Sequence, residues 1–363
     1  MKQGIKEILQ KDIFSPADLK RLLSASEADR LLILQQAALV KEKYIGNKVY
    51  FRGLIEISNR CAKNCYYCGI RSGNRNVSRY AITEAEALDA ARYAFTHHFG
   101  SIVIQGGELN NKKNTANITG LLRKIKTLSN NNLGITLSLG EQSEETYREW
   151  FNAGAHRYLL RIETSNRELY YKLHPENSKH NYDNRLKCLE TLKTIGYNVG
   201  TGVMIGLPFQ TMEDLAGDLL FFKSRDIDMV GMGPYIEHEN TPLYKYKDLL
   251  LPLSQRFQLS LTMVALLRIM MKDVNIAATT AMQTIDPQGR EKALKAGANV
   301  IMPNLTPLQY REGYLLYKNK PGTKEDSDEM MRRLEKEIIA AGCSMGYGEW
   351  GDSLHFKNRK SKT

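Results

Sequence analysis

The sequence Cys61-Ala62-Lys63-Asn64-Cys65-Tyr66-Tyr67-Cys68 comes shortly after the apolar run Val49–Ile57, which reads as a buried strand. Its three thiols form a chelating loop, because thiolates are soft ligands that suit iron–sulfur clusters and zinc. A closed structural site usually recruits four ligands, often as two Cys-x2-Cys pairs, and this chain has no second pair. The loop therefore predicts an iron–sulfur cluster in which one iron has no protein ligand.

Zinc is the alternative that this loop leaves open, with a distant histidine such as His97, His98 or His174 completing the set. The spacing of three and then two residues, with aromatic residues before the last cysteine, favours the cluster. Cys188 and Cys343 stand alone in predicted helices, and we interpret them as small buried apolar residues. Five cysteines in 363 residues do not form a disulfide framework, so we expect a reducing, oxygen-poor cytoplasm.

Composition and charge narrow the classes of function. With 42% hydrophobic residues, the chain is long enough for one α/β barrel with a sizeable core. The 51 basic and 40 acidic residues give a net charge of +11, which favours anionic partners without naming one. The densest basic cluster, Lys357–Lys362, lacks interleaved aromatic residues, so we expect no nucleic-acid partner. The sequence shows neither a signal-like segment nor a membrane-spanning stretch, which predicts a soluble cytoplasmic protein without membrane contact.

Short apolar runs alternate with helical segments from residue 50 onward, a pattern typical of βα units around a parallel sheet. We expect an α/β fold, a (βα)8 TIM-type barrel over residues 47–322. A helical extension over 1–46 would precede it, and a helix with a disordered basic tail over 323–363 would follow. Glycines 154, 196 and 297 predict left-handed helix stops. The expected strands are 49–57, 101–105, 134–138, 157–162, 198–205, 229–231, 275–279 and 299–302, and the expected helices are 83–95, 118–129, 144–153, 184–195, 212–224, 254–271 and 287–296.

The carboxyl ends of the strands in such a barrel gather on one face, where active sites lie. Chemically active or close-packing residues follow every predicted strand, and this shared position predicts a single site there. In strand order they are Cys61, Gly106-Gly107-Glu108, Ser138–Glu141, Arg161–Thr164, Gly206–Pro208, Gly231–Pro234, Thr279–Met282 and Pro303–Thr306.

Together these motifs resemble the radical S-adenosylmethionine (SAM) superfamily over nearly the whole chain. Its Cys-x3-Cys-x2-Cys signature, with an aromatic residue before the last cysteine, matches Cys61, Cys65, Tyr67 and Cys68. The resemblance implies that the cysteines hold a 4Fe-4S cluster and that the amine and carboxylate of SAM bind its fourth iron. It also implies that an electron from an external donor cleaves SAM to methionine and a 5'-deoxyadenosyl radical.

The resemblance also implies which residues contact SAM. Gly106, Gly107 and Glu108 are similar to the family's glycine-glycine-glutamate motif, in which small residues admit the methionine part and a carboxylate complements its ammonium. Glu163 matches a carboxylate that contacts the ribose or amine, and Arg185 would pair with the SAM carboxylate. Gly206 would lie beside adenine. A surface salt bridge for Arg185 and a turn role for Gly206 are the structural alternatives.

Within the superfamily, the chain resembles the HydE-type maturases of FeFe hydrogenase, in a subgroup with biotin synthase and methylornithine synthase. This implies action on an organometallic iron–cysteine complex with carbonyl and cyanide ligands, supplied by another maturation protein and attacked at sulfur. Arg161, Thr279 and Thr280 would bind the substrate, and Tyr310 would be a catalytic residue near the radical carbon. The motifs that carry this resemblance are Arg161–Thr164, Met229–Pro234, Asn240–Leu243, Ala278–Met282 and Gly297–Asn304.

One departure from this family predicts a single cluster. Several members carry further cysteines near the C-terminus for an auxiliary cluster, whereas Tyr314–Gly322 contains none. Alternative enzyme functions with the same SAM site are a carbon-skeleton rearrangement, as in methylornithine synthase, and sulfur insertion. The non-enzyme alternatives are a zinc-binding or cluster-binding electron carrier and a basic RNA-binding module.

Overall fold

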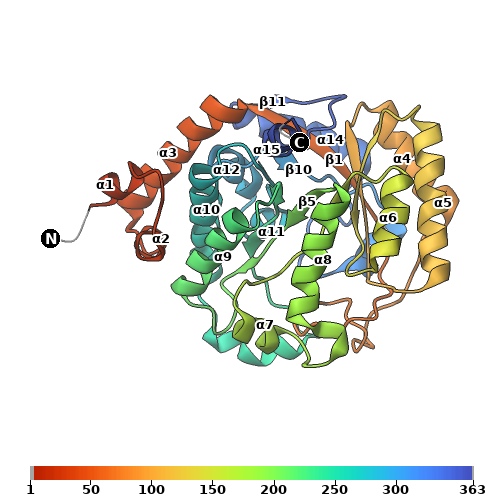
Figure 1. Ribbon diagram of the computed structural model, residues 1–363, viewed down its shortest axis with the longest axis horizontal. Coiled ribbons are helices and arrows are strands. Elements are labelled where there is room, and N and C mark those ends of the chain that lie inside the picture. Colours follow the sequence, from red (N-terminus) through yellow and green to blue (C-terminus); the bar gives the residue numbers. More distant parts are fainter. Residues whose placement is uncertain (1–3, 362–363) are drawn as a thin grey trace.

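Parallel strands run around a curled sheet in the computed structural model, which describes residues 4–361 (Figure 1). Their order is β10-β1-β2-β3-β4-β5-β7-β9, and a parallel bridge between Ala277 and Val300 joins the two ends of this path. There the N–H of Ala278 donates to the Val300 carbonyl at 2.9 Å. This confirms the expected (βα)8 TIM-type arrangement. The strands are β1 (Lys48–Ser58), β2 (Ser101–Gly106), β3 (Gly134–Ser138), β4 (Arg157–Leu159), β5 (Asn198–Thr201), β7 (Met229–Val230), β9 (Asn275–Ile276) and β10 (Val300–Ile301).

Helices cover the outside of the barrel and begin and end at the residues that their caps dictate. At the start of α4, the N–H of Glu86 donates to Oγ1 of Thr83 at 3.2 Å, and the N–H of Thr83 donates to the Glu86 carboxylate at 2.7 Å. Gly196 and Gly297 have φ angles of 105° and 125°, so the predicted left-handed stops are confirmed. The outer helices are α4 (Glu84–Thr96), α5 (Lys112–Leu128), α6 (Glu144–Asn152), α8 (Tyr182–Ile195), α9 (Met212–Ser224), α10 (Leu253–Met270) and α12 (Gly289–Lys295).

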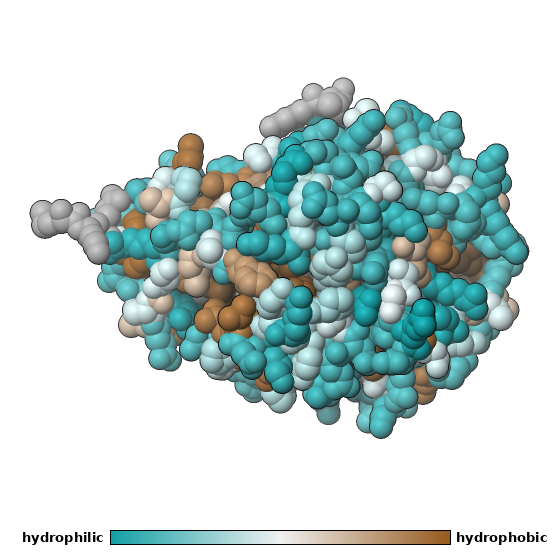
Figure 2. All heavy atoms as spheres, turned by 90° about the horizontal axis from the view of Figure 1, so that it is seen from below, coloured by the Kyte–Doolittle hydropathy of each residue, from teal (hydrophilic) through white to brown (hydrophobic). Residues whose placement is uncertain are grey.

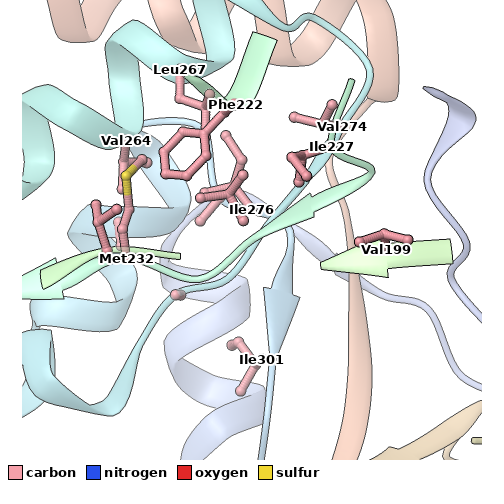
Figure 3. Packing of buried hydrophobic residues seen from close by; sticks show 14 of the residues in the cluster. Val199, Phe222, Ile227, Met232, Val264, Leu267, Val274, Ile276 and Ile301 are labelled. Carbon is pink, nitrogen blue, oxygen red and sulfur yellow. The ribbon is translucent and has the colours of Figure 1, made fainter. Parts of the chain in front are cut away.

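The hydrophobic core lies between these helices and the sheet. Figure 3 shows Phe222 of α9 and Leu267 of α10 gathered above Ile276 of β9, and all three are fully buried. Helix α10 is buried along most of its length, which agrees with its apolar sequence. Burial of such side chains stabilises the fold by ~1.5–3 kcal/mol each relative to leaving them exposed.

The N-terminal helices pack against one side of the barrel, as expected for the extension. They are α1 (Ile5–Leu9), α2 (Pro16–Leu23) and α3 (Glu27–Ile45), and they occupy the left side of Figure 1. Helix α3 packs along α10, and α2 packs on α9. Buried Leu19, Leu22 and Ile33 lie in this contact region, so the extension shares the main hydrophobic core.

Several elements between the strands differ from the sequence prediction. The predicted strand over 157–162 ends at Leu159, and the one over 198–205 is divided into β5 and β6 (Met204–Ile205), which pairs with β8 (Gly233–Pro234). The division falls where a Cβ at Gly202 would lie 1.8 Å from the Gly231 carbonyl oxygen. Short elements not foreseen are α7 (Arg167–Leu173), α11 (Thr280–Ile285), α13 (Leu308–Arg311), η1 (Ser178–His180), η2 (Pro242–Leu249) and η3 (Glu312–Tyr314).

The C-terminal segment corrects the expectation of a disordered tail after the last helix. After α14 (Ser327–Ala340), β11 (Ser344–Met345) pairs with β1, and α15 (Leu354–Lys360) packs on the residues just before β7 and β9. His355 bonds Asp226 at 2.6 Å and Asp273 at 3.0 Å, while Arg359 bonds Asp228 at 2.7 Å. These acidic partners are far away in sequence, so a basic composition alone could not reveal them.

The surface is mainly polar. Figure 2 shows a face on which hydrophilic side chains predominate and hydrophobic patches are separate. Among residues 4–361, no single helix is long and apolar enough to cross a membrane. Only the bent pair Pro242–Leu249 and Leu253–Met270 meets that criterion jointly, by length and composition.

Candidate active site at the carboxyl ends of the strands

The cysteine loop, residues 61–68, leaves the carboxyl end of β1 and is bonded to neighbouring loops. The N–H of Ala62 donates to the Glu108 carbonyl at 2.8 Å. The N–H of Asn64 donates to Nε2 of His180 at 2.9 Å. All three cysteines of the loop are free thiols of intermediate exposure. The loop therefore presents its thiols from a backbone that other segments hold in place.

Burial disfavours the thiolate form of these cysteines. It raises the pKa of Cys65 to about 12, and it also raises the pKa of Cys61 and Cys68. The backbone N–H groups of Lys63 and Glu108 oppose this effect at Cys61, and the Glu108 nitrogen lies 3.3 Å from Sγ of Cys61. Metal ligation requires thiolates, so thiols whose pKa is raised in this way need the positive charge of a metal. The donor set fits an iron–sulfur cluster.

The histidines considered for a zinc site are placed or bonded elsewhere. Within the described chain, no three His, Cys, Asp or Glu side chains are grouped around one metal-ion position. His97 and His98 lie at the far end of α4, beside the C-terminal segment. The ring nitrogens of buried His174 lie 2.9 Å from the Tyr170 carbonyl and 3.3 Å from the Tyr67 hydroxyl. With both nitrogens of His174 engaged, none of these histidines is placed to complete a zinc site.

Gly106-Gly107-Glu108 ends β2 and passes directly against the cysteine loop. A Cβ at Gly107 would lie 2.3 Å from the Arg60 carbonyl oxygen and 2.7 Å from Cβ of Cys61. The sequence predicts that small residues here admit SAM. The structure shows that Gly107 also admits the cysteine loop itself, because any side chain would displace it.

Lys63, Glu108, Glu141 and Arg185 form a buried four-charge network beside the cysteine loop. Nζ of Lys63 lies 3.2 Å from Oε1 of Glu108 and 3.0 Å from Oε2 of Glu141. Nε of Arg185 donates to Oε1 of Glu141, and its Nη1 donates to the Arg161 carbonyl at 2.7 Å. Burial raises the pKa of Glu108, whereas Arg185 and Lys63 outweigh burial at Glu141 and lower its pKa. Arg185 is therefore a buried ion-pair partner, and the surface alternative is excluded.

Lys63 and Glu141 are candidates to which the sequence assigns no role, although the run Ser138–Glu141 was expected at this face. Lys63 lies between two cysteines, and Glu141 lies in the loop after β3, so position alone gave a weak signal for each. Nδ2 of Asn184, one residue before Arg185, also donates to Glu141 at 2.8 Å. Glu141 thus collects bonds from the cysteine loop and from α8, which only the packed structure brings together.

Arg161 and Glu163 follow β4 and form a bidentate ion pair, with Nε–Oε1 and Nη2–Oε2 distances of 2.9 Å. Arg161 also donates to the carbonyls of Val203, at 2.9 Å, and Gly231. These bonds use four of the five N–H donors of a guanidinium, which leaves one on Nη1. Glu163 has a φ of 67°, a strained conformation for a non-glycine residue that is typical of functional sites.

Gly206 directly follows β6, and Thr279 and Thr280 come shortly after β9. Gly206 has a φ of 79°, a left-handed conformation that favours glycine, so this residue forms a turn. Oγ1 of Thr279 donates to the Met232 carbonyl at 3.4 Å, and Oγ1 of Thr280 accepts from Nη2 of Arg290 at 3.4 Å. Both threonines belong to the start of α11 rather than to a strand.

Tyr310 is not brought to the other predicted residues. Its hydroxyl donates to Oε1 of Glu86 at 3.0 Å, and its ring stacks on Tyr80 with 5.0 Å between centroids. Tyr310 lines a cleft of about 590 Å³ that also reaches Gly69, next to the last cysteine. The catalytic role of Tyr310 near the radical carbon stays a prediction, since a loop position does not fix the direction of a side chain.

Comparisons with known proteins agree with this geometry. The model of the Radical SAM superfamily matches residues 55–222. The FeFe hydrogenase maturase subunit HydE of Thermotoga maritima is 44% identical over 348 residues, which cover 96% of each chain. The chain belongs to the HydE family. It is a radical SAM enzyme of the FeFe-hydrogenase maturase type, and the electron-carrier and RNA-binding alternatives are overturned.

More distant relatives are similar in sequence or in fold. The 3-methylornithine synthase of Methanosarcina barkeri is 28% identical over 322 residues, covering 88% of this chain and 87% of its own length. The crystal structure of methylornithine synthase PylB superposes with a TM-score of 0.79 at 23% identity, covering 95% of this chain and 97% of that chain. Superfamily membership implies a 4Fe-4S cluster and SAM as cofactors.

Proposed function

We propose that this chain uses one 4Fe-4S cluster and SAM to act on an iron–cysteine complex bearing carbonyl and cyanide ligands. The reaction would serve assembly of the diiron subcluster of FeFe hydrogenase. The observation that supports this most directly is the gathering of free thiols and buried charges of both signs at one end of the barrel. Membership of the HydE family supports the maturation role.

Cys61, Cys65 and Cys68 would hold the cluster, which when bound and reduced supplies the electron that cleaves SAM to methionine and a 5'-deoxyadenosyl radical. Glu108 is suited to accept the SAM ammonium, because it is a buried carboxylate beside the cysteine loop. Arg185 is suited to bind the SAM carboxylate with its planar fork. The carboxylate of Glu163, the turn at Gly206 and the aromatic ring of Tyr67 complete the SAM contacts that we propose.

We propose a single cluster because the loop over residues 314–322 is held by side-chain bonds and not by a second cluster. Residues 314–322 contain no cysteine. Instead, Nζ of Lys320 bonds the carboxylate of Glu56, which is 1% exposed, and the Tyr314 carbonyl at 3.1 Å. Asn304 donates to the other oxygen of Glu56 at 3.1 Å. A buried ion pair thus anchors the loop.

The substrate is expected to be anionic, and Arg161, Thr279 and Thr280 are the residues that we propose to bind it. The remaining N–H of Arg161 and the threonine hydroxyls offer hydrogen bonds to a carboxylate or a cyanide nitrogen. The barrel would exclude water and so confine the radical to its target. External partners would be an electron donor and other hydrogenase maturation proteins, in the cytoplasm.

Three measurements on anaerobically reconstituted, reduced protein test this proposal, with and without SAM: electron paramagnetic resonance, iron analysis and an assay for 5'-deoxyadenosine. We expect a resonance signal of the cluster that changes on SAM addition, about four irons per chain and formation of 5'-deoxyadenosine. An iron content near eight would refute the single cluster. A signal that SAM leaves unchanged, without deoxyadenosine, would refute the SAM site.

A further inference from the structure

The four-charge network connects residues whose roles differ in the proposed function. Glu108 and Arg185 are the proposed partners of SAM, whereas Lys63 and Glu141 have no assigned role. All four are buried, with exposures of 7%, 8%, 5% and 4% respectively. They come from four segments: the cysteine loop, the loops after β2 and β3, and helix α8. Such a set is stable only when its charges are paired, because an unpaired buried charge is costly.

The charges of this network sum to zero, and so do those of the ammonium and the carboxylate of SAM. The sulfonium gives SAM a further positive charge, but the two groups proposed to meet Glu108 and Arg185 have opposite signs and leave the balance at those two residues unchanged. Lys63 bonds Glu108 and Glu141 together, and Glu141 bonds Arg185. Without Lys63, two buried carboxylates would share one guanidinium. Without Glu141, both cations would lose a partner.

Lys63 also ties this charge balance to the cysteine loop. It lies between Cys61 and Cys65, and its Nζ donates to the Lys179 carbonyl. The N–H of Glu141 donates to Oε2 of Glu108 at 3.0 Å, so the backbone after β3 fixes the same carboxylate. Movement of the loop would therefore displace Lys63 and release Glu108.

We propose that Lys63 and Glu141 are positioning residues for SAM: they hold Glu108 and Arg185 apart, charged and correctly oriented for the ammonium and the carboxylate of the methionine part. This inference rests on the proposed SAM site, and it adds two residues that neither the cysteine signature nor the glycine-glycine-glutamate motif includes.

The test measures the SAM dissociation constant by anaerobic equilibrium dialysis on reconstituted protein, together with iron content and the unfolding midpoint. The variants are Lys63→Met, Glu141→Gln and the double variant. Lys41→Met is the matched control, because Lys41 is a buried lysine, 3% exposed, that bonds the Leu294 carbonyl at 2.9 Å outside the site.

Lys63→Met is expected to retain its iron and to bind SAM about tenfold more weakly, a loss of ~1.4 kcal/mol. The double variant removes one charge of each sign and is expected to recover about threefold of that affinity. Lys41→Met should lower the unfolding midpoint and leave SAM affinity unchanged. Rescue by the double variant is a result that a purely structural lysine would not produce.

Equal SAM affinity in Lys63→Met and the wild type would overturn the proposal, and so would a double variant no better than Lys63→Met. Should Lys63→Met fail to retain iron, Glu141→Gln decides: about a tenfold loss of affinity supports the proposal, and unchanged affinity overturns it. A wild-type protein that does not bind SAM would instead refute the proposed function.

Discussion

Replacement of Gly107 by alanine should displace the cysteine loop. The added Cβ would lie 2.3 Å from the Arg60 carbonyl oxygen and 2.7 Å from Cβ of Cys61. Contact at ordinary van der Waals distance needs ~3.4 Å or more, so the two backbones must separate by roughly 1 Å. Overpacking of this size costs ~1–3 kcal/mol of folding free energy, and a shift of ~1 Å at a reactive site can cost ~100-fold in rate.

Gly120→Ala is the control, because Gly120 lies on the outer helix α5 and its added Cβ would meet no atom within 4 Å. Nothing has to move to admit this methyl group, so the variant should stay near wild type. Both proteins are reconstituted anaerobically and compared for iron content, denaturant unfolding and deoxyadenosine formation. We expect Gly107→Ala to lose iron and activity. If Gly107→Ala matches Gly120→Ala in all three measurements, the loop does not depend on this close approach.

Three further changes test other parts of the molecule. Cys68→Ala is expected to abolish iron retention and SAM cleavage. Cys188 is a buried cysteine on α8, so Cys188→Ala should keep both. SAM cleavage by the Cys68 variant would contradict the ligand assignment. Arg161→Met removes the bidentate partner of Glu163, so binding of the iron complex and of SAM should both weaken while slow SAM cleavage persists, and unchanged substrate affinity would refute that role. Hydrogen bonds and charges from Asp273 and Asp226 raise the pKa of His355 above 6.5. The stability that protonated His355 adds is therefore complete below pH 6.5 and is lost as the pH rises through the raised pKa. The difference in unfolding free energy between wild type and His355→Leu should shrink over that pH range, and a pH-independent difference would contradict the prediction.

The fold was largely predictable because its periodicity is local. Each strand is a short apolar run, and residues such as Thr83 and Gly196 mark helix boundaries through bonds within a few residues. The failures occurred where distant segments decide the structure. The break after β5 depends on the closeness of Gly202 to Gly231, and the order of the C-terminal segment depends on acidic residues more than a hundred positions earlier in the sequence, such as Asp226.

The site was predictable to the extent that its residues follow strand ends. That rule placed Cys61, Glu108 and Arg161 correctly at one face, because all parallel strands point the same way. It could not pair Lys63 with Glu141, since that contact depends on how the cysteine loop packs on the loop after β3. Nor could the rule predict the direction of a side chain in the loop after β10, where the Tyr310 hydroxyl bonds Glu86.

The two ends of the barrel hold buried charges differently, and the difference suits one end for ligand exchange. At the amino end, Arg52 donates to the Gly351 carbonyl at 3.1 Å and Arg157 to the Trp350 carbonyl at 3.0 Å. Arg157 also forms an ion pair with Asp352 of the same segment, which β11 and α15 hold in place, so both arginines tie that segment to the strands. At the carboxyl end, the four-charge network joins side chains of both signs from four segments, and main-chain bonds to Arg185, Lys63 and Glu108 hold them in place. Buried ion pairs of this kind can exchange partners with the ammonium and the carboxylate of a bound ligand without leaving a buried charge unpaired. The paired charges at the carboxyl end therefore match the two groups of SAM that we propose to bind there.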